Sequence, residues 1–197
     1  KEIHLLDLTA LVAGTQFRGQ FESRIKSLVD EVKAEGNITS GDAHVAVNYR
    51  RMLQTGLKEY RARAEQKLQE LDLTEAENLH KSYFYRAVLI VIDATVAFAK
   101  RYANLAFKMA QEETDEGRKA ELLEMSRVLN KVPYEPADTF YEAVQALWLV
   151  HLCLQIESNG HSLSYGRMDQ YLNPYYEKDL KEGRITEEAA CELLTNL

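Results

Sequence analysis

Apolar side chains recur at spacings of three and four residues through most of this chain, and this spacing predicts helices rather than a sheet. Pro133 and Pro136 mark a break between two of the helices, because proline cannot continue a helix. The clearest helical runs cover residues 47–71, 74–113, 115–130 and 140–156. The sequence therefore predicts a mainly α-helical chain.

The centre of the second run, residues 87–99, is apolar nearly all round. Such a pattern is typical of a helix that is buried on several sides. Asp93 lies inside this stretch, and a buried carboxylate needs a partner. We expect it to pair with one of the nearest cations in the sequence, namely Arg86, Lys100 or Arg101.

One short strand is predicted at residues 161–167, where HSLSYGR alternates polar and apolar side chains. A single strand cannot form a sheet alone, so we expect its partners to lie outside this chain. Alternation places His161 and Ser162 on opposite faces, and both can meet one ligand only if the strand begins irregularly. Arg167 and Asp169 are close enough in sequence to pair with each other.

Composition bounds the class of protein. The 197 residues are 46% hydrophobic and carry a net charge of −7, which suits one globular domain and disfavours nucleic acid as a partner. Charges interrupt the longest apolar runs, so no transmembrane segment is expected. Cys153 and Cys191 are interpreted as small core residues in a reducing compartment. The first residue is not Met, and Thr186 starts a last helix without a C-terminal cap, so we expect a piece of a longer polypeptide.

Two polar segments are candidates for chemistry. The first is the turn after the helix at 140–156, where Gly160 allows a tight bend and His161, Ser162 and Ser164 offer donors and acceptors for a small polar ligand. The alternative is a well-capped corner whose polar groups satisfy one another. His151, on the preceding helix among apolar side chains, is interpreted as a hydrogen-bonded core residue.

The second polar segment, residues 36–49, carries Asp42 and His44. Either Asp42 stabilises a turn or caps the next helix, or the loop enters a pocket. Asp42, His44 and His161 match no local metal-binding spacing, so no metal site is predicted. The Gly-rich phosphate loops, zinc motifs and nucleophile elbow are all absent from the sequence.

Three stretches carry a resemblance to a known family: PADTFYEAVQALWLVHLCLQI, ESNGHSLSYGRMDQYLNPYYEKDL and GDAHVAVNYRRMLQTGLKEY. They resemble the glycyl radical enzymes of the pyruvate formate-lyase-like superfamily. The similarity is greatest to the branch with choline trimethylamine-lyase and the B12-independent glycerol and propanediol dehydratases. The resemblance implies that residues 1–197 are a single helical portion of a larger pyruvate formate-lyase-like domain. It also implies that this domain contains a ten-stranded α/β barrel.

The resemblance also implies a mechanism. Enzymes of this family carry a glycyl radical that a partner radical S-adenosylmethionine activase installs, and they need no bound cofactor. The radical passes to a cysteine in a GCxE loop, and the thiyl radical starts an elimination. This chain has neither that loop nor the glycine motif, and Cys191 has the wrong neighbours. We therefore expect no catalytic residue in this chain and no activity from it alone.

Substrate-binding positions carry over by resemblance to His161 and Ser162, and also to Asp42, with His44 as a second candidate. Asp42 favours cleavage of choline to trimethylamine and acetaldehyde; glycerol, propanediol or hydroxyproline dehydration is the alternative. An alternative of another class is a non-catalytic helical interaction module. The resemblance further implies a homodimer in the cytoplasm, within a bacterial microcompartment in some cases, with a small-molecule substrate and without metal, nucleic acid or membrane.

Overall fold

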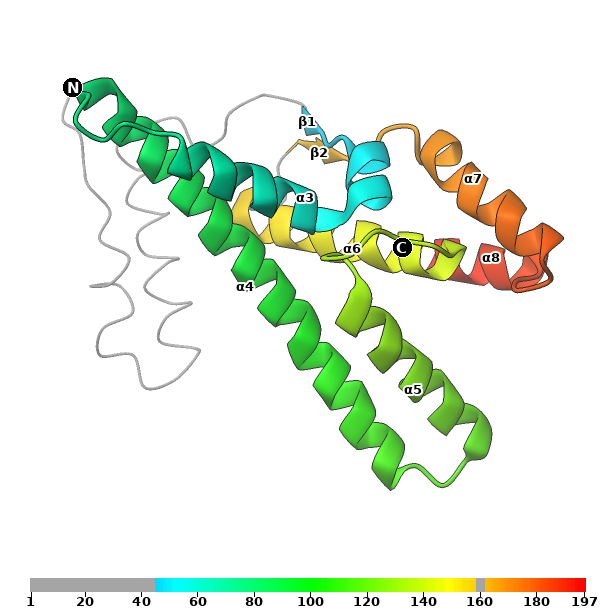
Figure 1. Cartoon of the computed structure of the whole chain (residues 1–197). Helices are drawn as coiled ribbons and strands as arrows, with labels where there is room; N and C mark the ends of the chain where they lie inside the picture. The colour runs from blue at the N-terminus through cyan, green and yellow to red at the C-terminus, as the bar shows by residue number, and fades with distance from the viewer. Residues whose placement is uncertain (1–44, 159–161) are drawn as a thin grey trace, which may run out of the picture. The chain divides into compact units, whose positions relative to one another are not determined.

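The computed structural model describes residues 45–158 and 162–197, and most of these residues lie in helices (Figure 1). The elements in chain order are β1 (Val45–Ala46), α3 (Tyr49–Gln69), α4 (Ala76–Glu112), α5 (Glu116–Lys131), α6 (Phe140–Ser158), β2 (Leu163–Ser164), α7 (Met168–Lys181) and α8 (Glu187–Thr195). The predicted helices are confirmed to within a few residues at each end. The ten-stranded barrel remains an expectation for the larger domain.

Helices α4 and α5 form an antiparallel hairpin, and α3 packs against α4 (Figure 1). Small side chains on α4 allow a close approach of the two helices. Ala106 and Ala110 are buried against Leu122 of α5, and Ala103 is buried against Leu129. The carboxylate of Asp115 accepts a hydrogen bond from the third residue of α5, which caps the helix after the turn.

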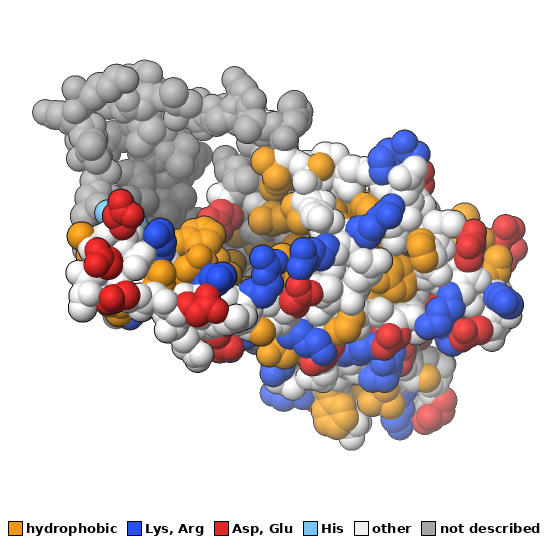
Figure 2. All heavy atoms as spheres, turned by 45° about the horizontal axis from the view of Figure 1, so that its top comes forward, with side chains coloured by type: hydrophobic (Ala, Val, Ile, Leu, Met, Phe, Trp, Pro, Cys, Tyr) orange, Lys and Arg blue, Asp and Glu red, His pale blue; other side chains and the backbone are white. Residues whose placement is uncertain are grey.

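The centre of α4 is buried on one side, through Ile92 and Ala99, and not on several sides as the sequence predicted. Phe84, Ile90 and Val91 are 64%, 68% and 54% exposed, and Figure 2 shows hydrophobic side chains among charged ones on one face. Asp93 is exposed as well, and it pairs with Arg61 of α3 at 3.0 Å rather than with a cation of its own helix. The sequence pattern reports the apolar character of a helix, but it does not show whether a partner covers it.

By length and composition alone, α4 would also be able to cross a bilayer. An 18-residue window reaches a mean hydropathy of 1.5, and 22% of that window is buried in the described unit. Core helices of soluble proteins meet the same criterion. Length and composition therefore do not distinguish a core helix from a membrane-spanning one.

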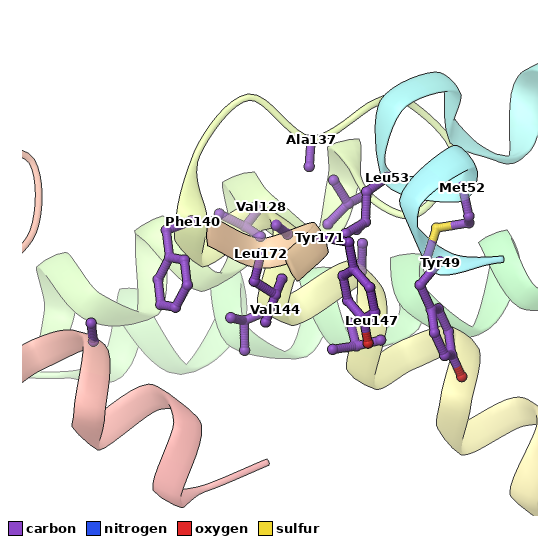
Figure 3. Close-up of a cluster of buried hydrophobic side chains, with 14 residues drawn as sticks. Tyr49, Met52, Leu53, Val128, Ala137, Phe140, Val144, Leu147, Tyr171 and Leu172 are labelled. Carbon is purple, nitrogen blue, oxygen red and sulfur yellow. The ribbon is translucent and has the colours of Figure 1, made fainter. Parts of the chain in front are cut away.

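The main core lies where α3, α6, α7 and α8 meet the end of α5 (Figure 3). Tyr49, Phe140 and Leu147 are at most 2% exposed, and Leu172 of α7 and Ala190 of α8 close the cluster. Complete burial of one large apolar side chain contributes roughly 1.5–3 kcal/mol to folding. This core supports the ends of α3 and α6 from which the two strands extend.

Helix α3 bends sharply at Gly56, whose φ of 68° lies in the left-handed region. The bend lets the loop before α6 bond to the helix backbone. The N–H groups of Leu57 and Lys58 donate to the carbonyls of Pro133 and Tyr134 at 2.9 and 3.0 Å. A β-carbon at Gly56 would lie 2.2 Å from the carbonyl oxygen of Tyr134, so only glycine fits here.

Two buried carboxylates stabilise the start of α6. Asp179 of α7 accepts a hydrogen bond from the backbone N–H of Phe140 at 2.7 Å. Glu142 accepts one from the N–H of Asp138 at 2.8 Å and pairs with Lys131 at 2.6 Å. The first N–H groups of a helix have no partner within the helix, and negative charge is favourable there. The two carboxylates therefore hold α6 in place against α5 and α7.

Candidate functional site

Strands β1 and β2 form a two-stranded parallel sheet with Val45 opposite Leu163 and Ala46 opposite Ser164. The N–H of Val45 donates to the carbonyl of Ser162 at 2.9 Å. The expectation that the strand at residues 161–167 finds its partners only outside this chain is wrong. Its first partner lies more than a hundred residues earlier in the same chain, and the paired stretch is only two residues long.

The sheet joins the two polar segments that the sequence singled out. Val45 directly follows His44, and Leu163 lies two positions after His161. Asp42, His44 and His161 themselves lie outside the described residues, so their predicted roles stay predictions. Among the described residues, Ser162 is the one that sequence analysis proposed for substrate binding.

Ser162 is half-buried and has a φ of 58°. A left-handed conformation is uncommon for residues other than glycine, and it often occurs at functional sites. It is also not the extended backbone conformation of a regular strand. This is the irregularity that a shared ligand of His161 and Ser162 would require.

The chain leaves β2 through a tight turn into α7. Gly166 has a φ of 65°, and its N–H donates to the hydroxyl of Ser164 at 3.0 Å. Arg167 and Asp169 pair at 2.8 Å, as the sequence predicted. These contacts fix the position at which the chain leaves β2.

Four ring side chains, three of them buried, cluster next to the ends of the two strands. The hydroxyl of Tyr49, at the start of α3, is 2.8 Å from Nδ1 of His151 on α6. The His151 ring stacks on Tyr165, the residue after β2, with centroids 3.9 Å apart. The hydroxyl of Tyr171 on α7 donates to the carbonyl of Tyr165 at 2.8 Å, and its ring lies 5.8 Å from that of Tyr49 (Figure 3). We call Tyr49, His151, Tyr165 and Tyr171 the aromatic cluster.

The aromatic cluster is electrically neutral near physiological pH. Burial lowers the pKa of His151 below its usual value. Burial, with a smaller contribution from Tyr165, raises the pKa of Tyr49. Nε2 of His151 lies 2.9 Å from the amide nitrogen of Gln155, a donor. The tautomer with its proton on Nδ1 then accepts from Gln155 and donates to the Tyr49 oxygen. The prediction that His151 is a hydrogen-bonded core residue is confirmed.

Sequence analysis did not single out Tyr49, Tyr171 or Gln155. Gln155 could have been found, because it lies one helical turn after His151 on the same face of α6. Tyr49 carries no such signal, because 102 positions separate it from His151. Only the tertiary structure brings these side chains together.

The two cysteines differ in their surroundings. Cys153 on α6 is half-buried, and burial raises the pKa of its thiol despite a hydrogen bond with Thr95. Cys191 on α8 is exposed, so the prediction that it is a core residue is wrong. The helix α8 packs on α6 through Ala190, and the side chain of Cys191, the next residue, is therefore left exposed. Neither thiol belongs to the aromatic cluster.

Comparison with known proteins identifies the family. The sequence profile of the family described as Pyruvate formate lyase-like matches residues 15–197. A probable dehydratase, YbiW of Escherichia coli, is 43% identical over 179 residues, which cover 89% of this chain and 22% of that protein. An isethionate sulfite-lyase of Nitratidesulfovibrio vulgaris is 46% identical over 149 residues, with 75% of this chain and 18% of that protein covered.

A solved structure that concerns 1,2-propanediol dehydration in Roseburia inulinivorans is 44% identical and has a TM-score of 0.74. The match covers 79% of this chain and 18% of that one. The chain thus spans about a fifth of the length of the relatives that it matches. It belongs to the pyruvate formate lyase-like family and is a partial chain of the glycyl radical enzyme superfamily.

Proposed function

We propose that this chain forms one side of the substrate pocket of a glycyl radical lyase that cleaves a C–N or C–O bond by radical elimination. The observation that carries the proposal is the parallel pairing of Val45 with Leu163. This pairing supports a shared pocket, because it joins the segment that follows Asp42 and His44 to the segment that follows His161. A small polar ligand needs a few convergent polar groups of this kind.

In this proposal Asp42, His44, His161 and Ser162 bind and orient the substrate. A hydroxyl of the substrate would bond to the Ser162 hydroxyl and to an imidazole, both of which can donate and accept. A carboxylate at Asp42 would favour a cationic substrate, and an imidazole at His44 would suit a neutral diol. Choline is therefore the candidate that depends on Asp42.

Dehydration of glycerol or propane-1,2-diol is the second candidate. It is supported by the 44% identity to the structure concerned with 1,2-propanediol dehydration. The sulfite-lyase relative, at 46% identity, indicates that the leaving group differs among similar proteins. The reaction that we propose is therefore the one shared by these candidates, namely elimination of a group next to a hydroxyl-bearing carbon. The experiment below identifies the substrate.

The rest of the enzyme would come from polypeptide beyond this chain. In the full-length protein we propose a thiyl-forming cysteine, a glycyl radical installed by a radical S-adenosylmethionine activase, and assembly as a cytoplasmic homodimer. The residues of this chain would bind substrate and exclude water. Catalysis would then require the full-length, activated protein.

The test uses the full-length protein, activated anaerobically and offered choline, glycerol and propane-1,2-diol separately. Trimethylamine and acetaldehyde from choline would establish the choline lyase, and Asp42→Asn should then raise KM. An aldehyde from a diol, with choline untouched, would establish a dehydratase and make His44→Ala the informative variant. A glycyl radical signal without turnover of any of the three would disprove these substrates. Failure to form any radical would favour the non-catalytic interaction module.

A further inference from the structure

The two strands are too short to fix their own positions. Each contributes two residues, and isolated two-stranded pairings are at best marginally stable in water. Something else must hold Val45 opposite Leu163. The aromatic cluster is placed to do so, because Tyr49 lies three residues after β1 and Tyr165 directly follows β2.

His151 contacts the exits of both strands. Its Nδ1 lies 2.8 Å from the Tyr49 hydroxyl, and its ring stacks on Tyr165 with an interplanar angle of 29°. Tyr171 holds the same exit from the other side through the carbonyl of Tyr165. Tyr49 is fully buried and His151 is 6% exposed, so water cannot readily replace these bonds.

We propose that His151 is a positioning residue: through Tyr49 and Tyr165 it fixes the register of β1 and β2, and so the placement of Ser162, the proposed substrate-binding residue directly before β2. The proposal rests on the proposed function for its effect on substrate, but its effect on the strands stands without it. His151 itself does not touch substrate. It remains neutral and acts through one hydrogen bond and one stacked ring.

The first test measures amide hydrogen exchange of the full-length protein. Tyr49→Phe removes the hydroxyl that bonds to His151, and His151→Asn keeps a donor but removes the stacked ring. Each should raise the exchange rate of the Val45 amide about fivefold, because the loss of one buried hydrogen bond is worth roughly 1 kcal/mol. This readout needs no turnover, so it remains valid if the substrate assignment fails.

The matched control is Val128→Ala, which removes a fully buried side chain from the same core but touches neither strand. It should lower thermal stability at least as much as Tyr49→Phe and leave exchange at Val45 unchanged. Equal exchange in all three variants would mean that the cluster is ordinary core packing, and the proposal would be wrong.

The second test separates binding from chemistry. With a substrate that the wild-type enzyme turns over, Tyr49→Phe and His151→Asn should raise KM about fivefold, in line with one lost hydrogen bond. The value of kcat per glycyl radical should fall less than about threefold. Val128→Ala should change neither constant. A loss confined to kcat would show that His151 does not act by positioning substrate, even if the exchange result holds.

Discussion

The carboxylate of Asp179 caps a helix that begins 39 positions earlier, by accepting a hydrogen bond from the N–H of Phe140 at 2.7 Å. Asp179 is 3% exposed. Its other oxygen binds Arg184 at 2.6 Å, so the carboxylate links the start of α6 to the turn after α7. Both of its oxygens are occupied. Arg184 also pairs with Glu182, but the N–H of Phe140 has Asp179 as its side-chain acceptor among the described residues.

Replacing Asp179 should therefore destabilise the fold strongly. Asp179→Asn places an amide N–H against either Phe140 or Arg184, and we expect a loss of about 3 kcal/mol, in the range for breaking a buried charged pair. The measurement is the denaturant midpoint of unfolding. Asp169→Asn is the control, because its pair with Arg167 is exposed and its loss should barely move the midpoint.

Gly56 offers a sharp test of backbone geometry. Gly56→Ala combines a left-handed φ with a clash against the Tyr134 carbonyl, and we expect a loss of more than about 3 kcal/mol. Gly183 has the same φ of 68° but nothing within 4 Å of an added β-carbon. Gly183→Ala should thus lose only about 1–2 kcal/mol, the left-handed penalty alone. Equal losses in thermal unfolding would contradict the clash.

Ionisation of Glu142 should make the free energy of unfolding fall as the pH is lowered into the acid range. Burial raises the pKa of Glu142, but hydrogen bonds from Lys131, the Asp138 N–H and Arg127 outweigh burial and hold it below the usual value. A lowered pKa means that the stabilisation is complete above the unfolded value of about 4.3 and is lost as pH falls through the folded value.

The corresponding measurement compares wild type with Glu142→Gln across that pH range. The variant should be less stable near neutral pH, and the difference should shrink below about pH 4 as wild-type Glu142 becomes protonated. Glu121→Gln, at an exposed position of α5, is the control and should show no such convergence. A gap that stays constant down to pH 2 would argue against a buried, ionised Glu142.

Ser162 separates the roles of its hydroxyl and its backbone. Ser162→Ala keeps the left-handed strain and removes the hydroxyl, whereas Ser162→Gly removes both. In the activated full-length enzyme both variants should raise KM, by about tenfold for one lost hydrogen bond to substrate. Ser162→Gly should in addition be up to about 1 kcal/mol more stable than Ser162→Ala. An unchanged KM in both would remove Ser162 from the pocket.

The helices were predictable from the sequence because their signals are local. Periodicity gave α3, α4, α5 and α6 to within a few residues, and Thr186 is the N-cap of α8 as expected. The bend at Gly56 was not foreseen. It depends on a loop more than seventy residues later, which bonds to the backbone around it.

The rest of the candidate site was not predictable for the same reason. Val45 and Ala46 lie in a loop-like stretch, and two residues cannot show a strand periodicity. Asp93 pairs with Arg61, 32 positions away, although Arg86, Lys100 and Arg101 lie much nearer in sequence. Tyr49 resembles any other core tyrosine until His151 is placed beside it. Long-range partners follow from packing, which the local pattern does not contain.

The separation of 102 positions between Tyr49 and His151 also sets an order of events during synthesis. The α4–α5 hairpin closes over a three-residue turn and can form as soon as it leaves the ribosome, because local contacts form first. The start of α3 must wait, without its partners, until α6 and then Tyr171 have been made. During that interval Tyr49 lacks the side chains that bury it in the folded unit, and a delay in elongation after α5 would prolong the exposure of this apolar surface.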